Sequence, residues 1–394
     1  MSGIYIHIPF CRRKCHYCNF FSLASQKLKE PFLDAVKKEI ALTRGYLAGE
    51  PVNTIYFGGG TPSVYRPAEL QEVMAGIDSP DSIKNPSPPD PSPRGEGRIF
   101  SAIDKEITIE LNPEDVTEEY VEELKDTWFN RFSLGVQSFF EEDLISLNRS
   151  HSAAQALNAV KLLHNAGYEN ISIDLIYGIP SSTPARWQEN LEIAFSLNVP
   201  HISAYSLTVE PKTPLAWMID RQKSEPVNDE SQVEQYKMLI NKTKEQGFLQ
   251  YEISNFCKPG HHAIHNTNYW NGVPYLGLGP SAHNFNGSSR RWNVANLSEY
   301  ITRLAKGDCL FEEEILTPAQ KYNEYVMTSL RTIRGCSLEQ IISNFQFPIS
   351  NYFLNRASVF LKRGLLSETS GVYFLTDEGK LFADMITSEL FLTE

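Results

Sequence analysis

The chain has 394 residues, a formal net charge of −12 and an isoelectric point near 5.3. This acidic balance argues against broad electrostatic binding to nucleic acid or anionic lipid. The sequence has neither a basic leader nor an apolar run of about 18 residues, so we expect a cytoplasmic protein with no membrane segment. Hydrophobic residues make up 41% of the chain, which is enough for a packed core in two or three domains.

Short β-branched and aromatic runs alternate with helical patterns through the first half of the chain. The predicted strands are residues 4–8, 54–57, 107–111, 131–136, 171–176 and 201–206. Helical patterns lie between them at residues 31–47, 67–77, 117–127, 153–166 and 183–197. This alternation indicates an α/β fold with a parallel sheet. Because no dinucleotide fingerprint follows the first strand, we expect a partial (β/α)6 barrel rather than a doubly wound sheet.

Three domains are expected along the chain. Residues 1–225 form the barrel core, with a proline-rich insert at 79–97 that we expect to be a surface loop, either simply disordered or partner-binding. Residues 226–315 form an extension that caps the barrel, with a helix at 233–246 and an irregular stretch at 251–292. Residues 316–394 form a small α+β module of winged-helix type.

Three of the six cysteines lie within eight residues, just after the first predicted strand. Cys11, Cys15 and Cys18 form a C-x3-C-x2-C loop that can ligate three corners of a [4Fe–4S] cluster. Three protein ligands leave one iron open for a substrate or cosubstrate. The alternatives are free thiols or structural zinc. Zinc needs four protein ligands, and His16 is poorly placed to be the fourth.

The cysteine loop and the strand before it resemble a known superfamily. The strings YIHIPFC and CHYC resemble the opening of the radical S-adenosylmethionine superfamily. They are most similar to its branch of oxygen-independent coproporphyrinogen III dehydrogenases and HemW-type heme chaperones. The resemblance implies that the open iron chelates the amino and carboxylate groups of S-adenosylmethionine. One electron, from a donor such as flavodoxin or ferredoxin, then splits the sulfonium to give a 5′-deoxyadenosyl radical.

A glycine-rich loop follows the second predicted strand. Its glycines let the backbone approach a ligand closely, and we expect its N–H groups to be free to bind a carboxylate. A tight strand-to-helix turn is the structural alternative. By resemblance, Gly59, Gly60 and Thr61 belong to the motif that holds the methionyl amino group.

Further polar residues fall in or after successive predicted strands. Glu110 ends the third strand, where it pairs with the ammonium of S-adenosylmethionine, joins an ion pair at the rim or is simply exposed to solvent. Asp174 lies in an otherwise apolar strand and needs a partner there. Barrel active sites gather at the carboxyl ends of strands. By resemblance, the residues that contact S-adenosylmethionine or line the radical chamber are Glu110, Gln137, Arg149 and Asp174, and Tyr5 and Tyr17 pack beside the cluster and the adenine.

The segment His265-Asn266-Thr267-Asn268-Tyr269-Trp270 bears on the subfamily. HemW-type proteins carry this HNxxYW motif, and the resemblance implies that His265 ligates heme iron. The alternative is that His265 and Asn266 brace a loop over the barrel mouth. Phe20 stands where the dehydrogenases have a further cysteine, and the first strand begins where they have an N-terminal extension.

These features lead to two functional hypotheses. The first is a heme chaperone that binds the cluster, S-adenosylmethionine and heme and passes heme to acceptor hemoproteins. The alternative is coproporphyrinogen III dehydrogenase, which converts two propionates to vinyl groups. Whether the chain is an enzyme stays open, as does whether it forms a homodimer.

Overall fold

The computed structural model describes residues 1–77, 105–309, 311–345 and 347–393. The proline-rich insert expected at 79–97 lies outside these residues. Two separate sheets are present in the described part of the chain, one of twelve strands and one of three. Each has its own buried core.

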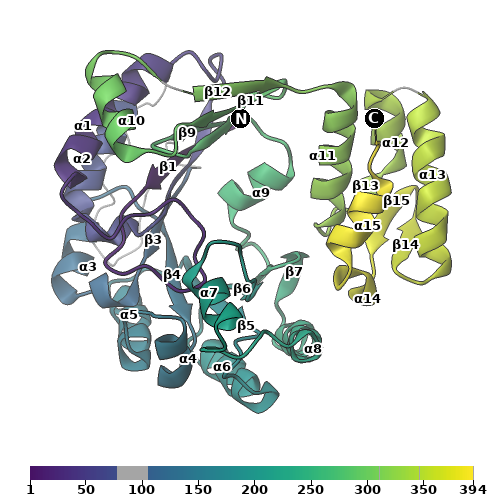
Figure 1. Ribbon diagram of the computed structural model, residues 1–394, viewed down its shortest axis with the longest axis horizontal. Helices are drawn as coiled ribbons and strands as arrows, with labels where there is room; N and C mark the ends of the chain where they lie inside the picture. Colours follow the sequence, from purple (N-terminus) through teal and green to yellow (C-terminus); the bar gives the residue numbers. More distant parts are fainter. Residues whose placement is uncertain (78–104, 310, 346, 394) are drawn as a thin grey trace, which may run out of the picture.

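The first six strands are parallel and stand side by side in chain order (Figure 1). They are β1 (Ser2–Ile8), β2 (Val52–Gly59), β3 (Glu106–Leu111), β4 (Arg131–Gln137), β5 (Ile171–Tyr177) and β6 (His201–Ser206). The sheet does not close on itself, because β9 pairs with the outer edge of β1 and β8 with the outer edge of β6. The predicted partial (β/α)6 barrel is therefore confirmed.

Helices connect these strands and cover the sheet. They are α1 (Lys29–Thr43), α2 (Pro67–Ile77), α3 (Glu118–Leu124), α4 (Glu141–Ser146), α5 (Ala153–Asn165), α6 (Pro184–Ser196), α7 (Pro214–Asp220) and α8 (Asp229–Glu245). Side-chain caps fix several starts; Ser152, for example, forms a capping box with Gln155. The sequence patterns did not predict α4 and α7, which have six and seven residues.

The strands alternate between an outer and an inner face. In β1, Ile4, Ile6 and Ile8 belong to the buried core that includes Phe32 of α1. The alternate residues of each strand, such as Tyr5, lie on the inner face. Because helices cover the outer face, the polar side chains of the strands gather inside the barrel.

The segment after α8 extends the same sheet at both edges. Its elements are β7 (Leu249–Glu252), β8 (Asn255–Cys257), α9 (Ile264–Trp270), β9 (Tyr275–Leu278), β10 (His283–Phe285), β11 (Ser289–Asn293), α10 (Leu297–Ala305) and β12 (Phe311–Ile315). The expectation of an irregular stretch at 251–292 was therefore wrong, because strands of three to five residues leave little pattern. Leu276, Leu278 and Leu304 share the barrel core.

The C-terminal module stands beside the barrel (Figure 1, yellow-green). Its elements are α11 (Pro318–Leu330), β13 (Cys336–Ser337), α12 (Leu338–Asn344), α13 (Phe347–Lys362), β14 (Leu366–Thr369), β15 (Val372–Leu375), α14 (Asp377–Lys380) and α15 (Ala383–Leu390). An antiparallel sheet in the order β13-β15-β14 and a core around Tyr322 and Phe353 give it a winged-helix-like form. Among the described residues, no helix has both the length and the apolar character needed to cross a bilayer.

Candidate functional site

A cavity of about 430 Å3 opens at the carboxyl ends of the parallel strands. Loops after β1 and β2 and residues of β3, β4 and β5 form its wall. The predicted site residues on that wall are Cys11, Cys15, Cys18, Tyr17, Gly59, Gly60, Thr61, Glu110, Gln137, Arg149 and Asp174. Residues that come from six separate parts of the sequence thus meet at one place.

The three thiols differ in exposure. Cys11 is buried, whereas Cys15 and Cys18 are half-buried. Burial raises the pKa of Cys11 and of Cys18, so these thiols hold their protons until a metal displaces them. No group of three or more His, Cys, Asp or Glu side chains in the described residues is close enough to hold a single metal ion. A cubane binds each thiolate at a different iron, whereas structural zinc needs four protein ligands at one ion.

Arg149 carries a half-buried positive charge beside the cysteine loop. One terminal nitrogen, Nη1, donates to Sγ of Cys15 at 3.2 Å, and Nη2 donates to Oδ1 of Asn112 at 2.8 Å and to the carbonyl of Gly135 at 2.9 Å. Its Nε is buried and has no hydrogen-bond partner among the described residues. A buried donor without a partner is costly, so this N–H is suited to bind an anionic group in the cavity.

Two carboxyl groups lie on the same wall. Glu110 accepts hydrogen bonds from the Tyr56 hydroxyl at 2.8 Å and from the Gly59 N–H at 3.2 Å, and burial raises its pKa to about 7. Asp174 accepts from the Ser133 hydroxyl at 3.2 Å, and burial raises its pKa to about 6. Both groups titrate near neutral pH, and a bound cation would favour their ionised forms.

The glycine-rich loop uses its N–H groups within the protein. The N–H of Gly59 donates to Glu110, that of Gly60 to the Ile8 carbonyl at 2.7 Å, and that of Thr61 to the Phe10 carbonyl at 2.7 Å. The expectation that these donors are free was therefore wrong. Gly59 has φ +107°, and a Cβ there would lie 2.4 Å from Nδ1 of His7, so the glycine allows close packing against β1.

Gln137 ends β4 in a conformation that glycine normally adopts. Its φ is +67°, and the pairing between β4 and β5 shifts register between Leu134 and Gln137. Such backbone costs free energy and gathers at functional sites. The irregular end of β4 brings Gln137, which is almost fully buried, to the cavity wall.

Tyr5 lies elsewhere than expected. Its hydroxyl and Nδ1 of His7 are 3.2 Å apart, and its ring lies 6.0 Å from that of Tyr56. Tyr5 does not line the cavity, because it lies in the middle of β1, whereas the loop that holds the cysteines follows the carboxyl end of that strand. Tyr17, which lies in that loop between Cys15 and Cys18, does reach the wall.

His265 lies at the opposite end of the barrel. The Glu106 carboxylate, at the start of β3, accepts from the N–H groups of Ile264 and His265 at 2.8 Å each and so holds the first turn of α9. Nδ1 of His265 bonds to the Thr54 hydroxyl near the start of β2. Helix α9 therefore closes the amino ends of the strands, and the idea of a brace over the barrel mouth was wrong.

The His265 ring is not presented as an iron ligand. It is 2% exposed, and its two nitrogens bond to the hydroxyls of Thr54 and Tyr269 at 2.8 and 2.9 Å. Burial lowers its pKa to about 3, so the ring is neutral. Heme ligation by His265, expected from the motif, would require both the burial and the Tyr269 bond to be broken.

The sequence interpretation missed residues inside the barrel. Tyr56 joins Glu110 to the His265 ring, on which it stacks at 5.1 Å, and Glu106 anchors α9. Period-two alternation in β2 and β3 places Tyr56, Glu106 and Glu110 on the inner face. That alternation was the available signal, but it does not reveal partners more than 150 residues away.

Comparison with known proteins places the chain in a family. The profile of the Radical SAM superfamily matches residues 5–194. The chain is 31% identical over 389 residues to the heme chaperone HemW of Bacillus subtilis, with 98% of each chain covered. It is 30% identical over 397 residues to the heme chaperone HemW of Escherichia coli, with 100% and 98% covered. The chain belongs to the HemW family.

A solved structure supports the same fold. The coproporphyrinogen III oxidase HemN of Escherichia coli, described as a radical SAM enzyme, matches with a TM-score of 0.81 over 99% of this chain and 90% of that one. The two sequences are 22% identical. At that identity the match establishes that this chain has the same fold as HemN, and nothing about its activity.

Proposed function

We propose that this HemW-family chain binds heme and passes it to acceptor hemoproteins. The names of its relatives in Bacillus subtilis and Escherichia coli support this function. We further propose a [4Fe–4S] cluster on Cys11, Cys15 and Cys18. The observation that carries the cluster proposal is the meeting of three thiols on one cavity wall beside Arg149, where the described residues include no fourth cysteine.

The same cavity offers complementary groups for S-adenosylmethionine. The free Nε–H of Arg149 suits the carboxylate of the methionyl part, and the Glu110 carboxylate suits its ammonium. Asp174 and Gln137 complete the polar wall. Cys11, Cys15 and Cys18 would hold the cluster, which, reduced by a flavodoxin or ferredoxin, would provide the electron for cleavage of the sulfonium. The chain's residues hold the cosubstrate and keep water from it.

Anaerobic reconstitution tests the cluster. The expected result is a full complement of iron and sulfide, and an electron paramagnetic signal of the reduced sample that changes when S-adenosylmethionine is added. Cys11→Ala should lose both. Cys309→Ala is the matched control, because this half-buried cysteine lies outside the cavity and should load normally. Zinc-loaded or metal-free protein after reconstitution would refute the cluster.

A second assay separates the chaperone from the alternative enzyme. The fold shared with HemN keeps coproporphyrinogen III dehydrogenation as the second candidate. Phe20, which is 64% exposed on the cavity wall, offers no thiol where that enzyme has one. We expect heme to move from the loaded chain to an apo-hemoprotein, and we expect no protoporphyrinogen from coproporphyrinogen with reductant and S-adenosylmethionine. Turnover of the porphyrin without heme transfer would reverse the assignment.

A further inference from the structure

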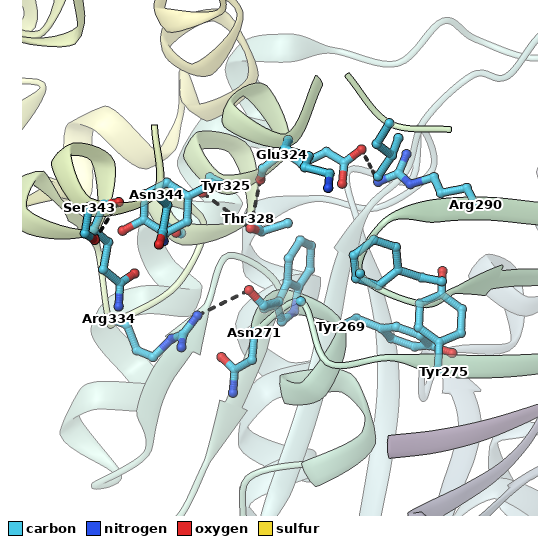
Figure 2. A pocket seen from close by; sticks show the side chains of 18 residues that line it. Tyr269, Asn271, Tyr275, Arg290, Glu324, Tyr325, Thr328, Arg334, Ser343 and Asn344 are labelled. Carbon is cyan, nitrogen blue, oxygen red and sulfur yellow. Dashed lines mark hydrogen bonds and ion pairs between the residues drawn. The ribbon is translucent and has the colours of Figure 1, made fainter. Parts of the chain in front are cut away.

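A second cavity, of about 860 Å3, lies between the barrel and the C-terminal module (Figure 2). Helix α9 and the strands β9 to β11 form one side, and α11, α12 and the turn between them form the other. Because α9 closes the amino ends of the strands, this cavity lies at the opposite end of the barrel from the cysteines. Its volume is in the range of small-molecule and cofactor sites.

The charge of the lining favours an anion. Arg290, Lys321 and Arg334 face a single carboxylate, Glu324, in a chain whose net charge is −12. Arg290 pairs with Glu324 at 2.9 Å, and Arg334 donates to the Trp270 carbonyl at 3.2 Å (Figure 2). The Arg334 guanidinium keeps further donors after that one bond, and Lys321 adds a second cation. The cavity therefore has groups for two carboxylates.

Aromatic rings form the wall on the barrel side. Tyr269 and Tyr275 meet edge to face at 4.5 Å, and Tyr275 lies 6.3 Å from Phe285. Trp270 completes this wall. Large aromatic faces suit a flat apolar body. Together with the cations, they fit a planar tetrapyrrole that carries carboxylates.

The phenol of Tyr275 is the best-placed iron ligand. The described residues on the cavity wall include no histidine, cysteine or methionine. The hydroxyl of Tyr269 is bonded to His265, and that of Tyr325 bonds to the backbone of Ser337. The Tyr275 hydroxyl has no hydrogen-bond partner in the described part of the chain. Burial raises its pKa, the charge of Arg290 opposes that rise, and the charge of Glu324 adds to it.

We propose that this cavity is the heme site, with Tyr275 as the axial ligand of the iron and Arg334 and Lys321 paired with the propionates. The inference rests on the proposed heme function and gives it a location. When ferric heme binds, the O–H bond of Tyr275 breaks, its proton passes to solvent, and an iron–oxygen bond forms with no change of oxidation state. Tyrosinate is an established heme ligand. His265 then acts only as a buried brace for Tyr269.

Heme titration of the full chain tests the ligand. The wild type should show the phenolate-to-iron charge-transfer band and a high-spin ferric spectrum. Tyr275→Phe should lose that band and bind heme about tenfold more weakly. His265→Phe should keep the band. Tyr168→Phe is the matched control, because Tyr168 packs against Phe132 on the barrel and does not line the cavity, and it should match the wild type.

A second series tests the carboxylate contacts. Arg334→Gln should weaken heme binding about tenfold and leave binding of heme dimethyl ester unchanged, because the ester has no charge to pair. Iron-free protoporphyrin should depend on Arg334 in the same way but not on Tyr275. The measurements on Arg334→Gln test the carboxylate contacts even if Tyr275→Phe binds no heme.

The outcomes also separate this inference from the proposed function. If the wild type takes up heme while Tyr275→Phe and Arg334→Gln leave its spectrum and affinity unchanged, the cavity is not the site and the heme function stands. If His265→Phe is the variant that loses the wild-type heme spectrum and Tyr275→Phe keeps it, His265 is the ligand and the assignment of Tyr275 is overturned. If the wild type binds no heme at all, both proposals fail.

Discussion

The Tyr56 hydroxyl donates to Oε1 of Glu110 at 2.8 Å while the Tyr56 ring stacks on His265 at 5.1 Å. A single side chain thus reaches from α9, which closes the amino ends of the strands, to the cavity that holds the cysteines. The hydrogen bond stabilises the ionised form of Glu110 and opposes the effect of its burial.

This contact predicts how S-adenosylmethionine binding depends on pH. The pKa of Glu110 is about 7, so the carboxylate that pairs with the cosubstrate ammonium forms as pH rises through that value. We expect the affinity of the cluster-loaded protein to increase between pH 6 and pH 8, by calorimetric titration. Tyr56→Phe should move the midpoint upward, because it removes a donor that lowers the pKa of Glu110.

Glu110→Gln is the control for that measurement. An amide does not titrate, so the pH profile of this variant should be flat at a lower affinity. An unchanged slope in Glu110→Gln would assign the titration to another group, with Asp174 as the first candidate.

At position 137, the usual order of stability between an alanine and a glycine variant should be reversed. Alanine is usually better tolerated than glycine in regular structure, but at φ +67° glycine escapes the cost of a Cβ. Gln137→Gly should therefore be more stable to denaturant than Gln137→Ala by about 1 kcal/mol. Both should bind S-adenosylmethionine more weakly than the wild type, because both lose the amide. An alanine variant as stable as the glycine variant would show that the backbone relaxes there.

The sequence predicted the parts of the fold whose signals are local. The strands β1 to β6 read as short runs rich in β-branched and aromatic residues between helical patterns. The spacing of Cys11, Cys15 and Cys18 indicates a cluster without reference to the rest of the chain. Tyr56 and Glu106 escaped notice because their roles depend on partners brought together by the sheet. The position of His265 could not be predicted for the same reason. The motif identifies the residue, but only the hydrogen bond with Thr54 places it inside the barrel.

Glu106 predicts a large loss of stability. Its carboxylate accepts two N–H groups of α9 and lies 3.9 Å from Nε of Arg131, and both side chains are almost fully buried. Glu106→Ala leaves the Arg131 charge without a carboxylate and should lower the free energy of unfolding by about 3–5 kcal/mol. Glu106→Gln keeps one acceptor oxygen, so it should lower the free energy of unfolding by less than Glu106→Ala does. Denaturant titration measures both.

The comparison for Glu106 is an exposed ion pair. Glu72 pairs with Lys37 at 2.8 Å on the surface, so Glu72→Ala should lower the free energy of unfolding far less than Glu106→Ala does. Equal losses at the two positions would mean that α9 does not depend on Glu106.

Glu39 predicts that stability changes with pH. This buried residue of α1 accepts from the Gly279 N–H at 2.8 Å, the Asn293 amide at 2.6 Å and the Tyr300 hydroxyl at 2.5 Å, yet burial raises its pKa to about 7. Because the folded pKa lies above the unfolded value, its contribution to stability is full below about pH 4.5 and is lost as pH rises through about 7.

The test compares the wild type with Glu39→Gln, which cannot titrate, by denaturant unfolding at pH 5 and pH 8. The variant should be less stable at pH 5, because its amide nitrogen faces groups that donate. The difference in free energy of unfolding between the wild type and Glu39→Gln should narrow by up to about 3 kcal/mol at pH 8, where the wild type must bury a charge. Glu230→Gln, an exposed change in α8, should show no such trend. A difference that widens with pH would mean that the three donors outweigh burial and hold the Glu39 pKa below its usual range.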